Sequence, residues 1–459
     1  MRTKFSPQLY IDFSRESSLK VVTEYRRKYE RISDILRANP RIVGLAHNDF
    51  SKLLSTSRRG RRSTHTSEQI LRALLVMFLE QEPYRKTVIS INDNEFLRHF
   101  VGLGDRGMMD YSFLCRAMGV LSKETLHAMN DLLFDWAVAS GKTGGENLRL
   151  DTTVYETNIH HPTDSSLLWD GFRTLTRILR GAQRAYPEYL VRHRFHDKKV
   201  KKLSYFIARN AKSNAKGTKR KVKSTYRTLT ERTAWIVEVA REAIVLLEKT
   251  GDWEVKELID ELRHYVLLVE RVIYQTEQRV FHGIMLPADQ KVYSLFEPHT
   301  ELLKRGKAGK PVEFGHKVLI AQTAEKFIHH YRALPKQQND RDLLAPTLQE
   351  HKRLFDALPD MLATDKGFYQ NMRQIEGLER EIETVSIAKK GRRTREQYER
   401  ETNEAFIEGQ KFRAGCEGSI SVLKRAFNLG ICLFKGFKNF AASVGLAVLC
   451  HNLVLLARL

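Results

Sequence analysis

Cysteine is scarce in this sequence: there are four, and none forms a Cys-x-x-Cys pair. That scarcity argues against a disulfide framework and against a cysteine-based zinc site. The first residues contain no apolar signal core. The single long apolar run, 440–456, is interrupted by His451 and Asn452, so we expect a buried helix there rather than a membrane span. These features predict a soluble, cytoplasmic protein with no membrane partner.

Acidic residues are also in short supply relative to basic ones. Lys and Arg number 77 against 55 Asp and Glu, giving a net charge of +22 over 459 residues. An excess spread along the chain attracts polyanions, and nucleic acid is the usual partner. The length is sufficient for a large core and for more than one folding unit.

The most basic segment is 192–227, where Asp197 is the only acid and Tyr205, Phe206 and Tyr226 are interleaved. A solvated face is the usual interpretation of a charge run. A run this one-sided would repel itself without a polyanion, so we favour phosphate contact. The candidate DNA-binding residues here are Lys198, Lys199, Lys219, Arg220 and Lys221.

Helical spacing of apolar residues dominates residues 1–145. It predicts helices over 17–39, from Thr66 onward, and over 84–91, 95–101, 111–118 and 123–139. A basic loop contributes Arg59, Arg61 and Arg62. Short helices beside such a loop suit a DNA-binding unit of helix-turn-helix kind, although a plain helical packing domain fits the pattern equally well.

The period changes at 147–157, where apolar and polar residues alternate as in a strand. Asp151 occupies the middle of its polar face, where Asp is disfavoured, so it is a candidate site residue. Further strands are predicted at 291–296, 312–323, 327–333, 360–365 and 385–387, with a basic turn at 304–311 and a helix at 344–357. Residues 165–285, between the strand at 147–157 and the one at 291–296, are predicted to be helical. Within this region the helices at 230–250 and 255–278 are expected to form an antiparallel pair.

A late amphipathic helix carries Arg413, Glu417 and Lys424 within roughly 40° of one line along its surface. An exposed ion-pair ladder is the simpler interpretation of that spacing. Gly415 and Gly418 weaken the ion-pair interpretation. Glycine is costly inside a helix, but it allows other groups to come close.

Three carboxylates therefore stand out: Asp151 on a strand, Asp365 at a strand end and Glu417 on the helix. A mixed sheet with these strands as neighbours and the helix crossing them would bring the three together. Like charges at about 4 Å repel by roughly 4 kcal/mol at an effective dielectric near 20, so such a cluster takes up protons or cations. All-oxygen ligands favour Mg²⁺ or Mn²⁺.

At these residues the chain resembles the DDE transposases of bacterial insertion sequences. The likeness rests on Leu150-Asp151-Thr-Thr, on Val312-Glu-Phe-Gly-His-Lys-Val and on Ala363-Thr-Asp365-Lys-Gly-Phe. It is strongest at Arg413-x₃-Glu417-x₆-Lys424, which is similar to the signature of one large branch of the family. That branch normally has a Tyr three residues before the Arg, where this chain has Gln410.

The resemblance implies an α/β fold with an RNase H-like mixed sheet and flanking helices. It implies an all-helical N-terminal DNA-binding domain over 1–145 and a catalytic domain over 146–459. The segment between Asp151 and Asp365 is far longer than the roughly 25 residues that two strands and their turns need. We therefore expect the basic helical region 165–285 to be an insertion in the catalytic domain.

The resemblance also implies that Asp151, Asp365 and Glu417 are the catalytic metal ligands, holding two Mg²⁺ (or Mn²⁺) ions. Arg413 and Lys424 would contact phosphates of the transposon end, and Lys317 is a further candidate DNA contact. The implied activity is cleavage at insertion-sequence ends and joining of the 3′-hydroxyl to target DNA, by a homodimer or larger assembly associated with the nucleoid. A non-catalytic DNA-binding protein, such as a decayed copy, is the alternative.

The pair His160 and His161 follows the first strand, close to Asp164. A third metal site or a proton relay is one interpretation of this pair. A structural role in a loop is the more common use of such histidines.

Overall fold

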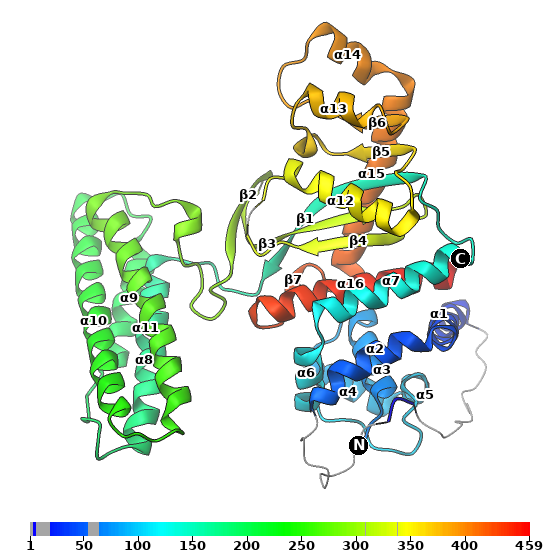
Figure 1. The fold of residues 1–459 in the computed structure, drawn as a ribbon. Helices are drawn as coiled ribbons and strands as arrows, with labels where there is room; N and C mark the ends of the chain where they lie inside the picture. The colour runs from blue at the N-terminus through cyan, green and yellow to red at the C-terminus, as the bar shows by residue number, and fades with distance from the viewer. Residues whose placement is uncertain (1–2, 6–18, 54–63, 308, 337) are drawn as a thin grey trace. The chain divides into compact units, whose positions relative to one another are not determined.

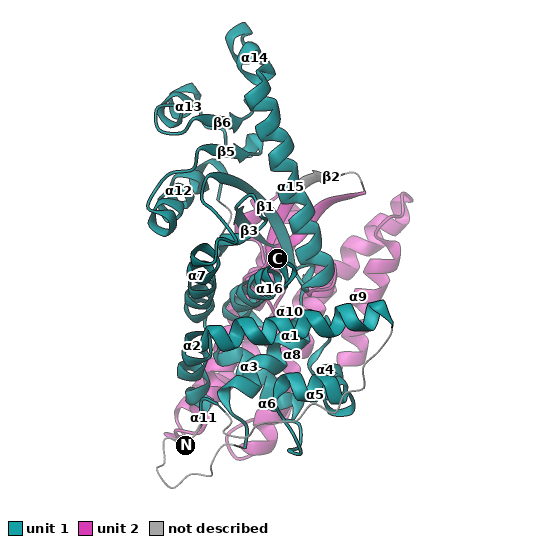
Figure 2. Ribbon diagram, turned by 90° about the vertical axis from the view of Figure 1, so that its right-hand side faces the viewer, with its two compact units in different colours: residues 1–156, 316–459 teal, residues 157–315 magenta. Residues whose placement is uncertain are grey.

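The computed structural model describes residues 3–5, 19–53, 64–307, 309–336 and 338–459. The chain divides into two compact units, which Figure 2 shows in different colours. Unit 1 comprises residues 1–156 and 316–459, and unit 2 comprises residues 157–315. The expected basic loop with Arg59, Arg61 and Arg62 lies outside the described residues.

Unit 1 begins with a series of helices. They are α1 (Lys20–Ala38), α2 (Pro40–Phe50), α3 (Ser67–Leu79), α4 (Tyr84–Asp93), α5 (Glu95–Val101), α6 (Tyr111–Val120) and α7 (Lys123–Ala139). Helix α3 begins after Thr66 because Thr66 and Gln69 cap each other's backbone N–H groups. The predicted bounds of α5 and α7 are confirmed. Helix α2 was not predicted; Pro40 occupies its first turn, where proline is favoured.

The strands form one mixed sheet in the described part of the chain, in the order β2-β3-β1-β5-β6, with β4 beside β3 and β7 beside β1. Their bounds are β1 (Asn147–Thr157), β2 (Glu301–Lys307), β3 (Lys310–Gln322), β4 (Ile328–Ala333), β5 (Met361–Thr364), β6 (Thr384–Ile387) and β7 (Ile431–Cys432). Strand β1 pairs in parallel with β5, and β5 with β6, whereas β3 is antiparallel to β2 and β4. The expected α/β class is confirmed.

One predicted strand is wrong. Residues 291–296 are not a strand, because the Ser294 hydroxyl accepts from the N–H groups of Phe296 and Glu297 and holds a turn. The strand β2 lies instead where we expected a basic turn, and Gly309, with φ 83°, makes the connection to β3. Lysines are common on edge strands, since they discourage pairing with other chains. The basic residues therefore mark an edge strand rather than a turn.

Both faces of the sheet in unit 1 are covered by helices. On one face, Leu148 and Leu150 of β1 share a core with Leu343 and Leu344 of α12 (Arg341–Phe355). Helix α13 (Met372–Leu378) contributes to the same core. On the other face lie α15 (Glu404–Ala426), which follows α14 (Arg395–Thr402), and α16 (Gly436–Arg458) (Figure 1). The face of β1 that carries its polar residues is thus covered, and its Arg149 is only 4% exposed.

Helix α16 is the segment that the apolar run predicted. Among the described residues it is the helix long and apolar enough to cross a membrane, but 94% of its most apolar window is buried inside the fold. The polar Asn452 is accommodated in this buried helix because its amide donates hydrogen bonds to Asn130 and to the carbonyl oxygen of Ile328. This burial is typical of a core helix.

Unit 2 is built on the long helices α8 (Asp164–Ala185), α9 (Asp197–Asn210), α10 (Lys216–Glu248) and α11 (Val255–Glu277). Leu168, Phe172, Ile236 and Leu262 lie in their shared core. The helix expected over 230–250 is longer than predicted, because α10 also includes the second half of the basic run. The first part of β3, up to Gly315, pairs with β2 within this unit.

Candidate active site

Asp151 and Asp365 are brought together by strand pairing. In the parallel pair β1–β5, Leu150 is the register partner of Thr364, so the residues that follow, Asp151 and Asp365, occupy neighbouring positions on adjacent strands. Adjacent strands lie about 4.8 Å apart. Asp365 ends β5 because its carboxylate accepts from the N–H of Lys366 and caps a short turn. The two aspartates therefore lie side by side in the interior of the sheet, Asp151 in the middle of β1 and Asp365 just after the end of β5.

Helix α15 adds Arg413 and Glu417. One nitrogen of the Arg413 guanidinium lies 3.0 Å from a Glu417 oxygen and 3.8 Å from an Asp151 oxygen. The side chains of Asp151 and Arg413 are 17% and 19% exposed, whereas that of Glu417 is 63% exposed. The structure therefore joins Asp151, Arg413 and Glu417 through ion pairs, and Glu417 retains access to solvent.

The donor atoms of this site are carboxylate oxygens, which suit Mg²⁺ or Mn²⁺. Within the described residues, no group of three or more His, Cys, Asp or Glu side chains is close enough to hold a metal ion in the present arrangement. The guanidinium of Arg413 lies where a cation would neutralise Asp151 and Glu417. The chemistry of the residues fits a divalent ion, provided that Arg413 gives way to it.

Cys416, next to Glu417, is fully buried. Burial raises the pKa of its thiol, and the nearby charge of Asp151 raises it further. A thiol held in the neutral form is a poor nucleophile, so Cys416 acts here as a small packing residue.

Arg149 is a residue of this site that the sequence did not single out. Its guanidinium donates to Gln322 Oε1 (3.1 Å) and to the carbonyl oxygen of Phe412 (3.0 Å), and lies 4.8 Å from the centre of the Phe412 ring. Burial lowers its pKa. The available signal was a charged residue between Leu148 and Leu150 near the start of the strand, two positions before Asp151.

Gln410 stands where the similar family branch has tyrosine. Its amide nitrogen donates to the Ser386 carbonyl oxygen (2.8 Å) and hydroxyl (3.0 Å), and lies 3.4 Å from the carbonyl oxygen of Thr364. The Gln410 side chain therefore makes hydrogen bonds within the fold, connecting α15 with the ends of β5 and β6.

The predicted DNA-binding residues lie in different environments. Lys198 and Lys199 on α9 and Lys219, Arg220 and Lys221 on α10 are all exposed. Lys424 lies in the last turn of α15. Lys317 is only 16% exposed, and its ammonium group donates to Asp340 (2.9 Å) and to the carbonyl oxygen of Gln338. A phosphate contact by Lys317 would therefore require this ion pair to break.

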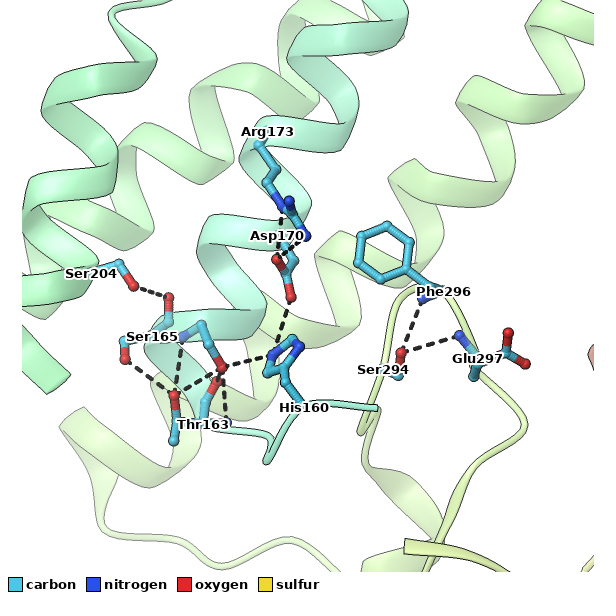
Figure 3. Close-up of polar contacts among 10 residues, drawn as sticks. His160, Thr163, Ser165, Asp170, Arg173, Ser204, Ser294, Phe296 and Glu297 are labelled. Carbon is cyan, nitrogen blue, oxygen red and sulfur yellow. Dashed lines mark hydrogen bonds and ion pairs between the residues drawn. The ribbon is translucent and has the colours of Figure 1, made fainter. Parts of the chain in front are cut away.

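The histidines after β1 belong to unit 2. Figure 3 shows the ring of His160 facing Asp170, and its Nε2 lies 3.3 Å from that carboxylate. Asp170 also accepts from Arg173, and burial raises the pKa of this carboxyl. His161 packs edge-on against the ring of Phe314. Both rings thus have protein partners within unit 2.

Comparison with known proteins gives one family match. Residues 289–453 match the family model of the transposase DDE domain. This range includes Asp365, Arg413, Glu417 and Lys424, whereas Asp151 lies before it. No curated protein and no solved structure matches the chain.

Proposed function

We propose that this chain cleaves DNA at insertion-sequence ends and joins the freed 3′-hydroxyl to target DNA. The match of residues 289–453 to the transposase DDE domain confirms the resemblance to insertion-sequence DDE transposases and is the basis of this proposal. The observation that carries the proposal is the position of α15. Arg413 on this helix lies 3.8 Å from Asp151 and 3.0 Å from Glu417, and the register of β1 and β5 makes the positions of Asp151 and Asp365 neighbours, which supports the proposal. An RNase H-like arrangement of the sheet belongs to the same proposal.

In this proposal Asp151, Asp365 and Glu417 hold two Mg²⁺ or Mn²⁺ ions. When bound, such ions activate the attacking oxygen and neutralise the leaving oxygen of a phosphodiester. Arg413 holds Asp151 and Glu417 in place beforehand. Once the carboxylates are neutralised, its guanidinium becomes available for a phosphate of the DNA end, which it matches as a bidentate donor.

DNA recognition is assigned to separate basic surfaces. Lys424 would contact a phosphate about two helical turns from Glu417. The exposed residues of α9 and α10 would bind the duplex backbone without reading sequence. The helices of residues 1–145, with Arg59, Arg61 and Arg62, form the proposed N-terminal DNA-binding domain, and 165–285 is the insertion in the catalytic domain. The partners are the terminal inverted repeats and target DNA, bound by a homodimer or larger assembly in the cytoplasm at the nucleoid.

The test is Mg²⁺-dependent cleavage of a duplex that carries the inverted repeat flanking this reading frame. Wild-type chain should nick it at the repeat boundary, and Asp365→Asn and Glu417→Gln should abolish the nick. Glu408→Gln is the matched control, because Glu408 is an exposed glutamate on the same helix. Cleavage that survives both site variants would remove these carboxylates from the chemistry.

A non-catalytic DNA-binding protein is the second candidate. It is favoured by the ion pairs of Arg413, which occupy Asp151 and Glu417. Such a protein would retard the same duplex in a gel but would leave it intact over the full range of Mg²⁺ and Mn²⁺ concentrations. The cleavage assay therefore separates the two functions.

A further inference from the structure

Two polar side chains attach α15 to the sheet, one close to each strand aspartate. Arg149 precedes Asp151 by two positions on β1, and the amide of Gln410 reaches Thr364, which precedes Asp365 on β5. We propose that Arg149 and Gln410 are positioning residues that fix α15 on the sheet, so that Arg413 stays paired with both Asp151 and Glu417. This inference rests on the proposed transposase function and concerns the same site.

The Arg149 attachment depends on an unusually close approach. A Cβ atom on Gly415 would lie 2.1 Å from Arg149 Nη1, so a side chain at this position would force the guanidinium or the helix to shift. The same nitrogen donates to the carbonyl oxygen of Phe412, three residues earlier on the helix. Since Arg149 is 4% exposed and also bonded to Gln322 of β3, its position is set by the sheet. A shift of the guanidinium would break its bonds to Gln322 and Phe412, and a shift of the helix would move Arg413, so a Cβ at Gly415 disturbs the attachment in either case.

The Gln410 attachment has the same form. A Cβ atom on Gly409 would lie 2.4 Å from the Cβ of Ser386, so α15 and β6 are in direct contact there. The Gln410 amide donates to the carbonyl oxygen of Ser386, and the Ser386 hydroxyl donates to the carbonyl oxygen of Phe406. Ser386 is fully buried. These bonds tie the first half of α15 to the ends of the two parallel strands.

Together the attachments determine both the rotation and the axial position of α15. One residue of helix corresponds to about 100° of rotation and 1.5 Å of rise, so a slip of one residue would turn Arg413, and the Glu417 paired with it, away from Asp151. The contacts of Gln410 and Phe412 precede Arg413 on the helix, and the contact of Gly415 follows it. A displacement of about 1 Å at a reacting centre can cost about 100-fold in rate. Neither residue needs to touch DNA or metal to affect the chemistry.

The experiment compares Gly415→Ala with Gly418→Ala. Both add one methyl group to the same helix, but a Cβ at Gly418 meets nothing within 4 Å, whereas a Cβ at Gly415 meets Arg149. Gly415→Ala should lower the single-turnover cleavage rate about 10- to 100-fold, with DNA affinity measured in Ca²⁺ changed less than about twofold. It should also weaken Mn²⁺ binding measured by titration without DNA. Gly418→Ala should behave as wild type in all three measurements.

Gln410→Leu tests the second attachment with a side chain of similar size that cannot donate, and should show the same loss of rate without loss of DNA affinity. Arg149→Met should cost less in the Gly415→Ala background than in wild type, because both changes act on one contact. Thermal unfolding checks that each variant is folded. Equal rates and equal Mn²⁺ affinities for Gly415→Ala and Gly418→Ala would overturn the inference. An inactive wild type would count against the proposed function instead, and the Mn²⁺ titration would still decide the positioning role.

Discussion

One guanidinium nitrogen of Arg413 on α15 lies 3.8 Å from Asp151 on β1 and 3.0 Å from Glu417 one helical turn away. A single cation thus connects a strand carboxylate with a helix carboxylate that is distant in the sequence. The same two carboxylates are among the three that the proposed metal site uses. In the proposed site Arg413 therefore holds these two carboxylates together and also competes with a divalent ion for them.

Arg413→Gln should strengthen Mn²⁺ binding by the DNA-free chain, because it removes a positive charge beside two carboxylates. We expect a rise in affinity of about 3- to 10-fold, from the roughly 1 kcal/mol that a partly solvated charge contributes at such a distance. Titration calorimetry with Mn²⁺ measures it. Lys411→Gln, an exposed lysine on the same helix, is the control. Weaker binding by Arg413→Gln would show that the arginine organises the carboxylates more than it competes.

Glu417→Gln and Lys424→Ala should separate chemistry from binding. The first keeps shape but removes a negative charge, so cleavage should be lost while DNA affinity stays equal or rises. Lys424→Ala should lower the affinity for the DNA end and leave the Mn²⁺ affinity unchanged. A gel shift and a cleavage assay on the same duplex test both variants. If Glu417→Gln cleaved at the wild-type rate, the assignment of this glutamate would be wrong.

Neutralising Lys219 and Lys221 together should reduce the salt dependence of DNA binding. Each lost phosphate contact lowers the slope of log K against log salt by about 0.9. The matched control is Lys249→Gln with Lys256→Gln, two exposed lysines at the other end of α10 and the start of α11. Fluorescence anisotropy at several salt concentrations gives both slopes. Equal slopes for the two double variants would identify the basic run as a solvated face.

Acid should destabilise unit 1 through buried and half-buried histidines. Burial lowers the pKa values of His330, His351 and His451 to about 4. Between about pH 6.5, where an unfolded histidine titrates, and pH 4, the unfolded chain binds more protons, so the free energy of unfolding falls as pH falls. The stabilisation is fully present above pH 6.5 and is lost by about pH 4, on the order of 3 kcal/mol per histidine.

Urea unfolding followed by circular dichroism at pH 7, 6, 5 and 4 measures this loss. His451→Leu should reduce its steepness, because one of the buried imidazoles no longer titrates. A free energy of unfolding that is constant across this range would contradict the expected burial of these rings.

Local patterns were sufficient for much of the fold. The alternation of residues in β1 and the apolar spacing in α5 and α7 predicted those elements with their observed bounds. The spacing of Arg413 and Glu417 predicted their ion pair, because neighbours at i and i+4 meet on any helix. Edge strand β2 was missed, since its pairing with β3 depends on a partner rather than on its own residues.

The sequence by itself therefore determined which residue types could form the site: two aspartates at strand positions, and a helix with a glutamate between two cations. Tertiary structure decided what surrounds them. It buried Arg149 under α15, and it turned Gln410 toward Ser386. It also placed Asp365 beside Asp151 through the register of β1 and β5. The physical reason is that side-chain burial and strand register depend on contacts between distant segments, which no local periodicity encodes.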